Sequence, residues 1–442
     1  MTGAGPAIRE EMNGIAEAPG KTWFWELAAG VIDADRCIQC GTCVAVCPSD
    51  SIGIGRNDLP MLVKMCTGCS LCWDFCPRGG LRYEATWPVP APLVSPEAGP
   101  PAAPVPVPMP VVVRVPEPAL ARELPPEPAP APVDWKITGG RGEGLGLVER
   151  SYTARVNPRL PGAQDGGVVS AILVAALEAG DIDGALLARE SPTERWKGVA
   201  HLARTAAEVI ECGGSFYNQT MALGHLDLKG YDDLPSHPRI AVVGTPCEIQ
   251  GIRAMQSHDW NRGSARVDAV MLTIALLCTK SFDYEGLMLR QLRDKRGLDL
   301  DQVGKVDVIH GKMIVEDRQS QTMVCEPVRD FHGAALKGCD ECADFLGRSA
   351  DISVGSVGSP EGFSSVLVRS EVGARAFDRA VANLDVHDLQ RPEALAKLDA
   401  YDRKVALASL QRDFDPDGPL FIEYDEHVAS YEGTDRAPTV RK

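Results

Sequence analysis

The sequence predicts an α+β protein with a small cysteine-rich N-terminal domain, a proline-rich linker and a larger mixed α/β C-terminal domain. Eight of the 14 cysteines lie within residues 37–76, and 17 prolines lie within residues 88–132. Strand-like and helix-like segments alternate after residue 134, a pattern that favours a mixed sheet with covering helices. The expected boundaries are 1–20 for a flexible tail, 21–87 for the cysteine-rich domain, 88–133 for the linker, 134–428 for the large domain and 429–442 for a second flexible tail.

The overall composition excludes several classes of protein. Hydrophobic residues make up 44% of the 442 residues and charged residues 24%, as in ordinary globular domains. The formal net charge of −16 argues against a nucleic-acid partner, because binding phosphate requires a basic surface. No apolar run is long enough for direct membrane insertion, and residues 1–20 do not read as a signal peptide. We therefore expect a cytoplasmic protein.

The first eight cysteines form two copies of one motif. Each copy has three cysteines separated by two residues, followed after three more residues by a Cys-Pro pair. Three such thiolates hold three corners of a [4Fe–4S] cubane, and in two-cluster ferredoxins the cysteine before proline ligates the other cluster. The predicted ligands of the first cluster are Cys37, Cys40, Cys43 and Cys76, and those of the second are Cys66, Cys69, Cys72 and Cys47.

Zinc and disulfides are the alternatives for these cysteines. Zinc sites use four ligands, usually as two separated pairs, whereas this motif is a compressed triplet that occurs twice. Disulfide frameworks belong to small secreted chains, and this chain is long and shows no export signal. The spacing therefore favours a bacterial-type two-cluster ferredoxin domain.

The proline-rich stretch is expected to be a semi-rigid spacer. Proline fixes φ and removes the backbone donor, so residues 88–132 are unsuited to a helix or a central strand. The alternative is an ordered proline-rich segment wrapped on a domain. As a spacer, the stretch favours a ferredoxin-like head that moves relative to the large domain.

The large domain contains recognisable strands and helices. The apolar segment 168–178 predicts a helix, and residues 248–255 predict another. Short apolar runs predict buried strands, and two runs around a glycine-rich turn predict a late hairpin. The expected strands are 183–187, 239–243 and 269–277, and the hairpin strands are 351–354 and 365–368.

The large domain holds a second, sparser group of six cysteines. Cys339 and Cys342 form a chelating pair, and Cys247 and Cys278 each follow a predicted strand. A third metal site is favoured over unliganded thiols. Spacing alone does not choose four ligands from the six, which also include Cys212 and Cys325.

Residues 145–370 resemble the beta-subunit family of coenzyme F420 hydrogenases and dehydrogenases. Seven stretches together carry this resemblance: residues 164–169 (QDGGVV), Trp196 with 203–205 (ART), 213–217 (GGSFY), 244–247 (GTPC), 277–278 (LC), 338–345 with its GC and CADF segments, and 350–355 (ADISVG). The resemblance implies a flavin and iron–sulfur domain with one FAD, one further [4Fe–4S] cluster and coenzyme F420 as co-substrate.

The resemblance also implies site residues. The third cluster would be held by Cys247, Cys278, Cys339 and Cys342, which leaves Cys212 and Cys325 as spare thiols. Gly166 precedes a predicted helix N-terminus, where free N–H groups and the helix dipole suit phosphate. Many relatives carry a basic residue where Phe216 stands. The implied flavin contacts are Gln164, Asp165, Gly166, Gly167, Gly213, Gly214, Ser215, Tyr217, Gly244, Thr245 and Gly355.

The predicted function is electron transfer between coenzyme F420 and a one-electron carrier such as ferredoxin or a larger redox complex. FAD accepts a hydride from the coenzyme and passes single electrons to three [4Fe–4S] clusters. The FAD and the clusters carry out the redox chemistry. No catalytic side chain is singled out, and no dinucleotide fingerprint is found. Two alternatives remain: a reductase of another organic substrate fed by ferredoxin, or an electron-input subunit that works only within a larger complex.

Overall fold

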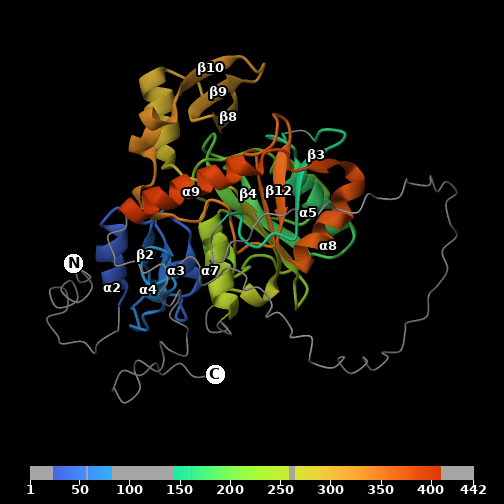
Figure 1. The fold of residues 1–442 in the computed structure, drawn as a ribbon. Helices are drawn as coiled ribbons and strands as arrows, with labels where there is room; N and C mark the ends of the chain where they lie inside the picture. The colour runs from blue at the N-terminus through green and yellow to red at the C-terminus, as the bar shows by residue number, and fades with distance from the viewer. Residues whose placement is uncertain (1–22, 56–57, 82–143, 161, 258–263, 410–442) are drawn as a thin grey trace, which may run out of the picture.

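The computed structural model describes residues 23–55, 58–81, 144–160, 162–257 and 264–409 (Figure 1). The predicted linker and both predicted tails lie outside these residues. Within the described part, no helix is both long and apolar enough to cross a membrane.

The N-terminal module is built on the two cysteine motifs. In each motif a one-turn helix starts just before the third cysteine, after a residue in the left-handed region, Gly41 in one copy and Ser70 in the other. An antiparallel strand pair lies between the motifs in the chain. The elements are α2 (Phe24–Leu27), the π-turn η1 (Ala28–Ile32), α3 (Thr42–Ala45), β1 (Ile52–Ile54), β2 (Pro60–Leu62) and α4 (Leu71–Asp74).

An eight-stranded mixed sheet forms the centre of the large unit, in the order β13-β3-β12-β11-β7-β6-β4-β5. Strands β4, β6, β7 and β11 run parallel, and the outer strands pair antiparallel. The strands are β3 (Arg150–Val156), β4 (Gly184–Glu190), β5 (Gly198–Ala203), β6 (Ile240–Gly244), β7 (Val270–Leu276), β11 (Ile352–Gly355), β12 (Ser364–Val368) and β13 (Leu384–Asp388).

Both faces of this sheet are buried, because successive side chains of a strand point to opposite faces. In β6, Ala241 and Val243 belong to the apolar cluster with α5 and α8, whereas Ile240 and Val242 belong to the cluster with α7 and the N-terminal module. The helices are α5 (Val168–Glu178), α6 (Ala206–Glu211), α7 (Pro246–Ser257), α8 (Glu371–Ala380) and α9 (Pro392–Ser409), with the 3₁₀ turns η3 (Ala222–His225), η4 (Val267–Ala269), η6 (Val328–Ala334), η7 (Lys337–Glu341) and η8 (Val381–Asn383).

A separate three-stranded sheet, ordered β10-β9-β8, has its own apolar cluster. It lies at the top of the view in Figure 1, beside a π-helix. Its elements are η5 (Glu285–Asp294), β8 (Val303–Ile309), β9 (Lys312–Asp317) and β10 (Thr322–Pro327). The sequence prediction did not include this sheet.

The elements that the sequence did predict are confirmed. Helix α5 spans the predicted residues 168–178, and α7 covers the predicted 248–255. The predicted strands correspond to β4, β6 and β7, and the predicted late hairpin is the antiparallel pair β11–β12. The α+β class is therefore confirmed.

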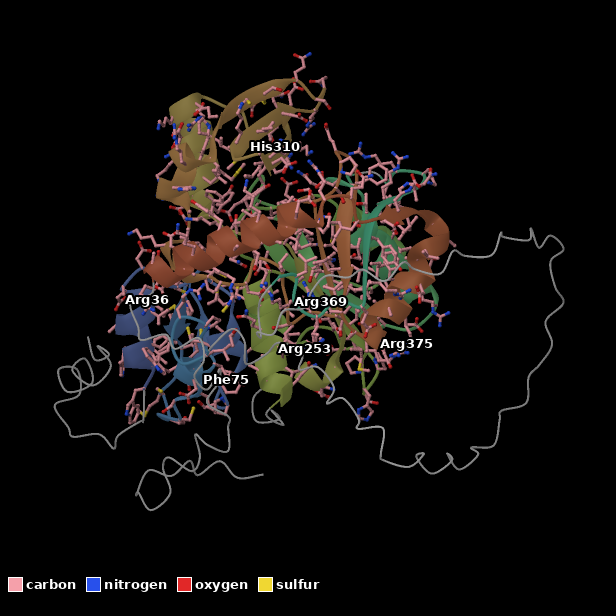
Figure 2. All side chains as sticks on the ribbon, viewed as in Figure 1. Arg36, Phe75, Arg253, His310, Arg369 and Arg375 are labelled. Atoms are coloured by element: carbon pink, nitrogen blue, oxygen red, sulfur yellow. The ribbon has the colours of Figure 1, made fainter. Side chains whose placement is uncertain are left out.

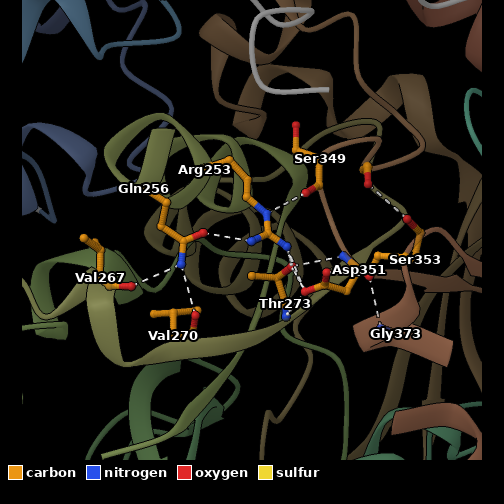
Figure 3. A network of polar contacts seen from close by, with 11 residues as sticks. Arg253, Gln256, Val267, Val270, Thr273, Ser349, Asp351, Ser353 and Gly373 are labelled. Atoms are coloured by element: carbon orange, nitrogen blue, oxygen red, sulfur yellow. Dashed lines mark hydrogen bonds and ion pairs between the residues drawn. The ribbon is translucent and has the colours of Figure 1, made fainter. Parts of the chain in front are cut away.

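A polar network centred on Arg253 fixes α7 to the sheet (Figure 3). The guanidinium donates to the carbonyl of Ser349 at 3.0 Å and to Thr273 Oγ1 of β7 at 2.9 Å. It also pairs with Asp351 at 2.8 Å, just before β11. This network ties one helix to two neighbouring strands, and Cys247 lies in the first turn of that helix.

The N-terminal module shares a hydrophobic core with the large unit. One buried cluster contains Leu27 and Val46 from the module together with Leu223, Ile249 and Ile252 from the large unit. Figure 1 shows the module beside α7 and below α9. The expectation of a movable ferredoxin head is therefore wrong, because moving the module would expose apolar surface that is now buried.

Candidate cofactor sites

The eight cysteines of the module surround two separate spaces. Cys37, Cys40, Cys43 and Cys76 line a space of about 350 Å³, a figure that includes its opening to solvent. Cys47, Cys66, Cys69 and Cys72 line a second space of about 290 Å³, measured in the same way. Each space thus takes three cysteines from one motif and the Cys-Pro cysteine of the other. These are the two groups that the sequence assigned to the two clusters.

Burial controls the protonation of these thiols. It raises the pKa of Cys37 to about 12 and that of Cys40 to about 11, and the pKa of Cys43 lies well above its ordinary value. In the second group, burial raises the pKa of Cys69 to about 11. Bound iron would offset this cost, because a cation stabilises the thiolate that ligates it.

The donor set fits clusters better than single ions. Within the described ranges, no three His, Cys, Asp or Glu side chains are gathered as ligands of one metal ion. Each cysteine group instead surrounds a wider space. In a cubane each thiolate binds a different iron, so its ligands need not converge on one point.

The third cysteine group forms at the carboxyl ends of two parallel strands. Gly244 of β6 pairs in register with Ala275 of β7, and Cys247 and Cys278 each follow three residues later. Burial raises the pKa of Cys278 well above its ordinary value, and the neighbouring Cys339 and Cys342 raise it further. The structure therefore brings all four predicted ligands of the third cluster together.

The third group also adjoins the first. Cys40, Cys247 and Ile38 lie in one buried cluster, with Cys339 packed against it. Burial raises the pKa of Cys247 well above its ordinary value, and the neighbouring Cys40 raises it further. The first and third cysteine groups are thus neighbours across the junction between the module and the large unit.

The two remaining cysteines lie elsewhere. Cys212 is buried in the apolar cluster of α5 and α8, and Cys325 is exposed on β10. Neither contributes to the three cysteine groups.

Residues that flank the cysteines join the first and third groups. Arg36 precedes Cys37, and Glu341 lies between Cys339 and Cys342. Arg36 Nε and Nη2 donate to the two carboxylate oxygens of Glu341, each at 2.7 Å, and both side chains are mostly buried. Figure 2 labels Arg36 at the edge of the module that faces α9. Sequence reasoning missed this pair, because its members are 305 positions apart.

The two loops predicted to contact flavin, residues 164–167 and 213–217, lie next to each other; we call them the first and second flavin loops. Gly162, beside the 164–167 loop, lies against Gly213 of the second loop. The Gly166 amide donates to Ser364 Oγ at 3.2 Å, and a Cβ on Gly166 would lie 2.5 Å from the carbonyl oxygen of Ala154. Only glycine allows this close approach, and Gly167 then caps helix α5 with a left-handed backbone. Gly214 and Ser215 continue the second loop.

Strand β8 contacts both of these loops. Gln164 Nε2 donates to the Val306 carbonyl at 3.0 Å, and the Tyr217 hydroxyl donates to Asp307 Oδ1 at 3.3 Å. Burial and the nearby Asp307 raise the pKa of Asp165, and burial raises the pKa of Tyr217 well above its ordinary value.

A buried glutamine connects these loops with the third cysteine group. Gln219 Nε2 donates to Thr245 Oγ1 at 3.2 Å and to Ser281 Oγ at 2.9 Å. Thr245 Oγ1 lies 3.1 Å from Cys247 Sγ. Gly244 ends β6 and Thr245 follows it, while Gly355 ends β11 at the same edge of the sheet. The sequence prediction did not include Gln219, because no motif marks it.

A buried donor lies beside the second flavin loop. Trp196 Nε1 is buried and has no hydrogen-bond partner among the described residues. Its ring lies 6.5 Å from that of Phe216, centroid to centroid, and, like Tyr217, it packs against the cluster that contains Phe282. A bound polar ring system would satisfy such a donor. The residues here therefore fit a flavin.

Three four-cysteine groups predict the metal content. At four irons per group, the anaerobically purified chain should hold about twelve iron atoms. Iron and acid-labile sulfide analysis measures this number. About eight iron in a fully reconstituted sample would contradict the third cluster, and stoichiometric zinc would contradict the whole assignment.

Three family descriptions match the chain. Residues 237–391 match the C-terminal part of the coenzyme F420 hydrogenase/dehydrogenase beta subunit, and residues 151–227 match its N-terminal part. Residues 30–82 match a 4Fe-4S dicluster domain.

Individual relatives agree with these matches. The beta subunit of coenzyme F420 hydrogenase from Methanosarcina barkeri is 32% identical over 54% of this chain and 81% of its own. One of the subunits of the F(420)H(2) dehydrogenase of Methanosarcina mazei is 25% identical over 85% of this chain and 92% of its own. The coenzyme F420-dependent sulfite reductase of Methanocaldococcus jannaschii is 27% identical, over 85% of this chain but half of that protein.

A solved structure shares the fold. A chain of the F420-reducing [NiFe] hydrogenase complex from Methanosarcina barkeri superposes with a TM-score of 0.55 and 28% identity, covering 60% of this chain and 92% of that one. The matches, the relatives and the fold agree: this chain belongs to the coenzyme F420 hydrogenase/dehydrogenase beta-subunit family and carries an N-terminal 4Fe-4S dicluster domain.

Proposed function

We propose that this chain is a flavin iron–sulfur oxidoreductase that exchanges electrons between coenzyme F420 and a one-electron partner. One observation carries the proposal. The third cysteine group adjoins the first at Cys40. Gln219, two residues after Tyr217 of the second flavin loop, donates to Thr245 and Ser281, which lie near Cys247 and Cys278 in the chain. Such an arrangement links a two-electron site to a chain of one-electron sites.

The bound groups would supply the redox chemistry: the flavin takes up a hydride and releases single electrons, which the clusters carry one at a time. The protein's own contribution is placement. The α5 N-terminus and the loop before it offer main-chain donors for phosphate, while Trp196 and Tyr217 border the place where a ring would bind. Five of the twelve cysteines in the three groups are buried and seven are partly buried, which limits the access of water to the thiolates.

We further propose that the chain works with a larger redox complex or a ferredoxin. Two kinds of relative support this: a beta subunit of a hydrogenase and a component of a dehydrogenase. The second group, with Cys47 and Cys66, lines a space of its own, and among the described residues the cluster that joins the first and third groups contains none of its cysteines. We expect electrons to pass between this group and the partner, because it is the last in the series of cysteine groups.

Phe216 favours a second candidate, a reductase of another substrate. Its side chain packs on Gly198, where a Cβ would lie 2.7 Å from Phe216 Cβ, and its ring is tilted by 57° to that of Trp196. A basic residue at this position would add a charge-assisted contact worth about 1.5–3 kcal/mol to an acidic coenzyme tail. Its absence weakens binding about ten- to over a hundredfold, which leaves coenzyme F420 usable at sufficient concentration.

Stopped-flow mixing under anaerobic conditions tests the donor. Reduced coenzyme F420 should bleach the flavin absorbance rapidly, while NADH and NADPH at equal concentration should bleach it slowly or not at all. The reason is that the chain offers flavin loops of this family and no dinucleotide fingerprint. Faster bleaching by a nicotinamide would reject the proposal, and reduction by ferredoxin alone would favour the second candidate.

A further inference from the structure

Arg78 lies between the first and third cysteine groups. It follows Cys76 and Pro77, is 1% exposed, and lines the space of the first group. Its Nε donates to the Gly338 carbonyl at 2.5 Å, and its Nη1 donates to the Pro77 carbonyl at 2.9 Å. One side chain of the module thus contacts the loop that presents two thiols of the third group.

The Arg36–Glu341 pair holds Arg78 in place. Arg36 Nη2 donates to the Arg78 carbonyl at 3.1 Å, while Nη1 donates to the Gly30 carbonyl at 2.8 Å. The same guanidinium donates two hydrogen bonds to the Glu341 carboxylate. The backbone of Arg78 and the loop of Glu341 are therefore fixed to one common side chain. With its backbone held in this way, the Arg78 side chain is kept toward the third group by its own hydrogen bond to Gly338.

We propose that Arg78 is a positioning residue that holds a positive charge between the first and third clusters and so favours the reduced state of both. This rests on the proposed three-cluster function. One electron leaves the third site, which is oxidised, and enters the first site, which is reduced. No proton moves, because the guanidinium stays protonated throughout. Each reduction adds a negative charge, and a nearby cation stabilises that charge strongly in a buried setting.

Two substitutions separate charge from packing. Arg78→Gln removes the positive charge, so the midpoint potentials of the first and third clusters should fall. Glu341→Gln removes a buried negative charge from the same loop, so these potentials should rise. Damage to the packing alone would not move the potentials in opposite directions. Arg239→Gln is the matched control, because it removes a positive charge at an exposed ion pair with Asp183, on a different part of the large unit.

The measurement is an anaerobic titration of the full holoprotein with dithionite and mediators, followed by EPR. For Arg78→Gln we expect at least a tenfold fall in the reduction equilibrium constant, about 59 mV for a one-electron couple. Glu341→Gln should shift the potentials upward, and Arg239→Gln should leave them unchanged. Unchanged potentials in both buried variants, or shifts of the same sign, would overturn the proposal. If Arg78→Gln loses iron, the upward shift of Glu341→Gln and a near-normal Arg78→Lys still decide it.

This titration uses no coenzyme F420, so it is independent of the donor. Shifted potentials with no bleaching by reduced coenzyme would reject the proposed donor and keep the role of Arg78. Normal bleaching of the flavin with unshifted midpoint potentials would keep the proposed donor and reject the role of Arg78. A holoprotein without a third cluster signal would reject the role of Arg78 together with the three-cluster path.

Discussion

Cys339→Ser is expected to remove the third cluster, about four of twelve iron atoms, while the flavin stays bound. Cys339 lies beside Cys342 and Cys278, and a serine hydroxyl is a far weaker ligand of iron than a cysteine thiolate. The flavin loops around Gly166 and Gly213 lie on other segments. Iron analysis, flavin absorbance and EPR of the reduced protein measure the outcome. Electrons from the flavin should then no longer reach the module, because the intermediate site is lost.

Cys325→Ser is the matched control for this change. Cys325 is exposed on β10 and belongs to none of the three groups, so its loss should change neither iron nor flavin content. Equal iron loss from both variants would show that the four ligands are wrongly chosen. Retention of all iron in Cys339→Ser would show the same.

Gly338→Ala should loosen the junction between the N-terminal module and the large unit. A Cβ on Gly338 would overlap the carbonyl oxygen of Arg36 and would lie 2.8 Å from Ile38 Cγ2. The two loops cannot keep their present approach, and overpacking of this kind costs about 1–3 kcal/mol or more. We expect a lower melting temperature and a slower passage of electrons from the third group to the first. Anaerobic thermal melting and single-turnover cluster reduction measure these two effects.

Gly333→Ala provides the comparison in the neighbouring turn η6. A Cβ there would meet nothing within 4 Å, so both properties should stay near those of the unmodified chain. If Gly338→Ala behaves like Gly333→Ala, the close contact between the two loops does not exist in solution.

Features that depend on the spacing of nearby residues, such as the cysteine motifs and the buried strands, are predicted well from the sequence. The triplet of cysteines before each Cys-Pro pair is local, and its partition into two groups is the one seen around the two spaces. Buried strands such as β6 and β7 are apolar runs, and their parallel register explains why Cys247 and Cys278 come together. Spacing does not select the third group, because its members come from separate stretches of the chain, and only the family resemblance selects them.

The parts that sequence reasoning missed are set by tertiary contact. Arg36 and Arg78 look like ordinary surface arginines in the sequence, and burial is what gives them a role. Gln219 has no motif around it, yet it joins Thr245 and Ser281. The β8–β10 strands mix polar and charged residues with apolar ones and show weak alternation. The expectation of a movable head failed because the linker composition says nothing about the apolar surface that the module buries.

Rapid freeze-quench EPR after mixing with one equivalent of reduced coenzyme F420 tests the central claim most directly. The account predicts that one hydride, which carries two electrons, appears as about two reduced cluster spins after the flavin bleaches. The third cluster should be reduced before the two clusters of the module, because it alone adjoins the flavin loops. A bleached flavin without any cluster spins, or cluster reduction that begins in the module, would contradict the account.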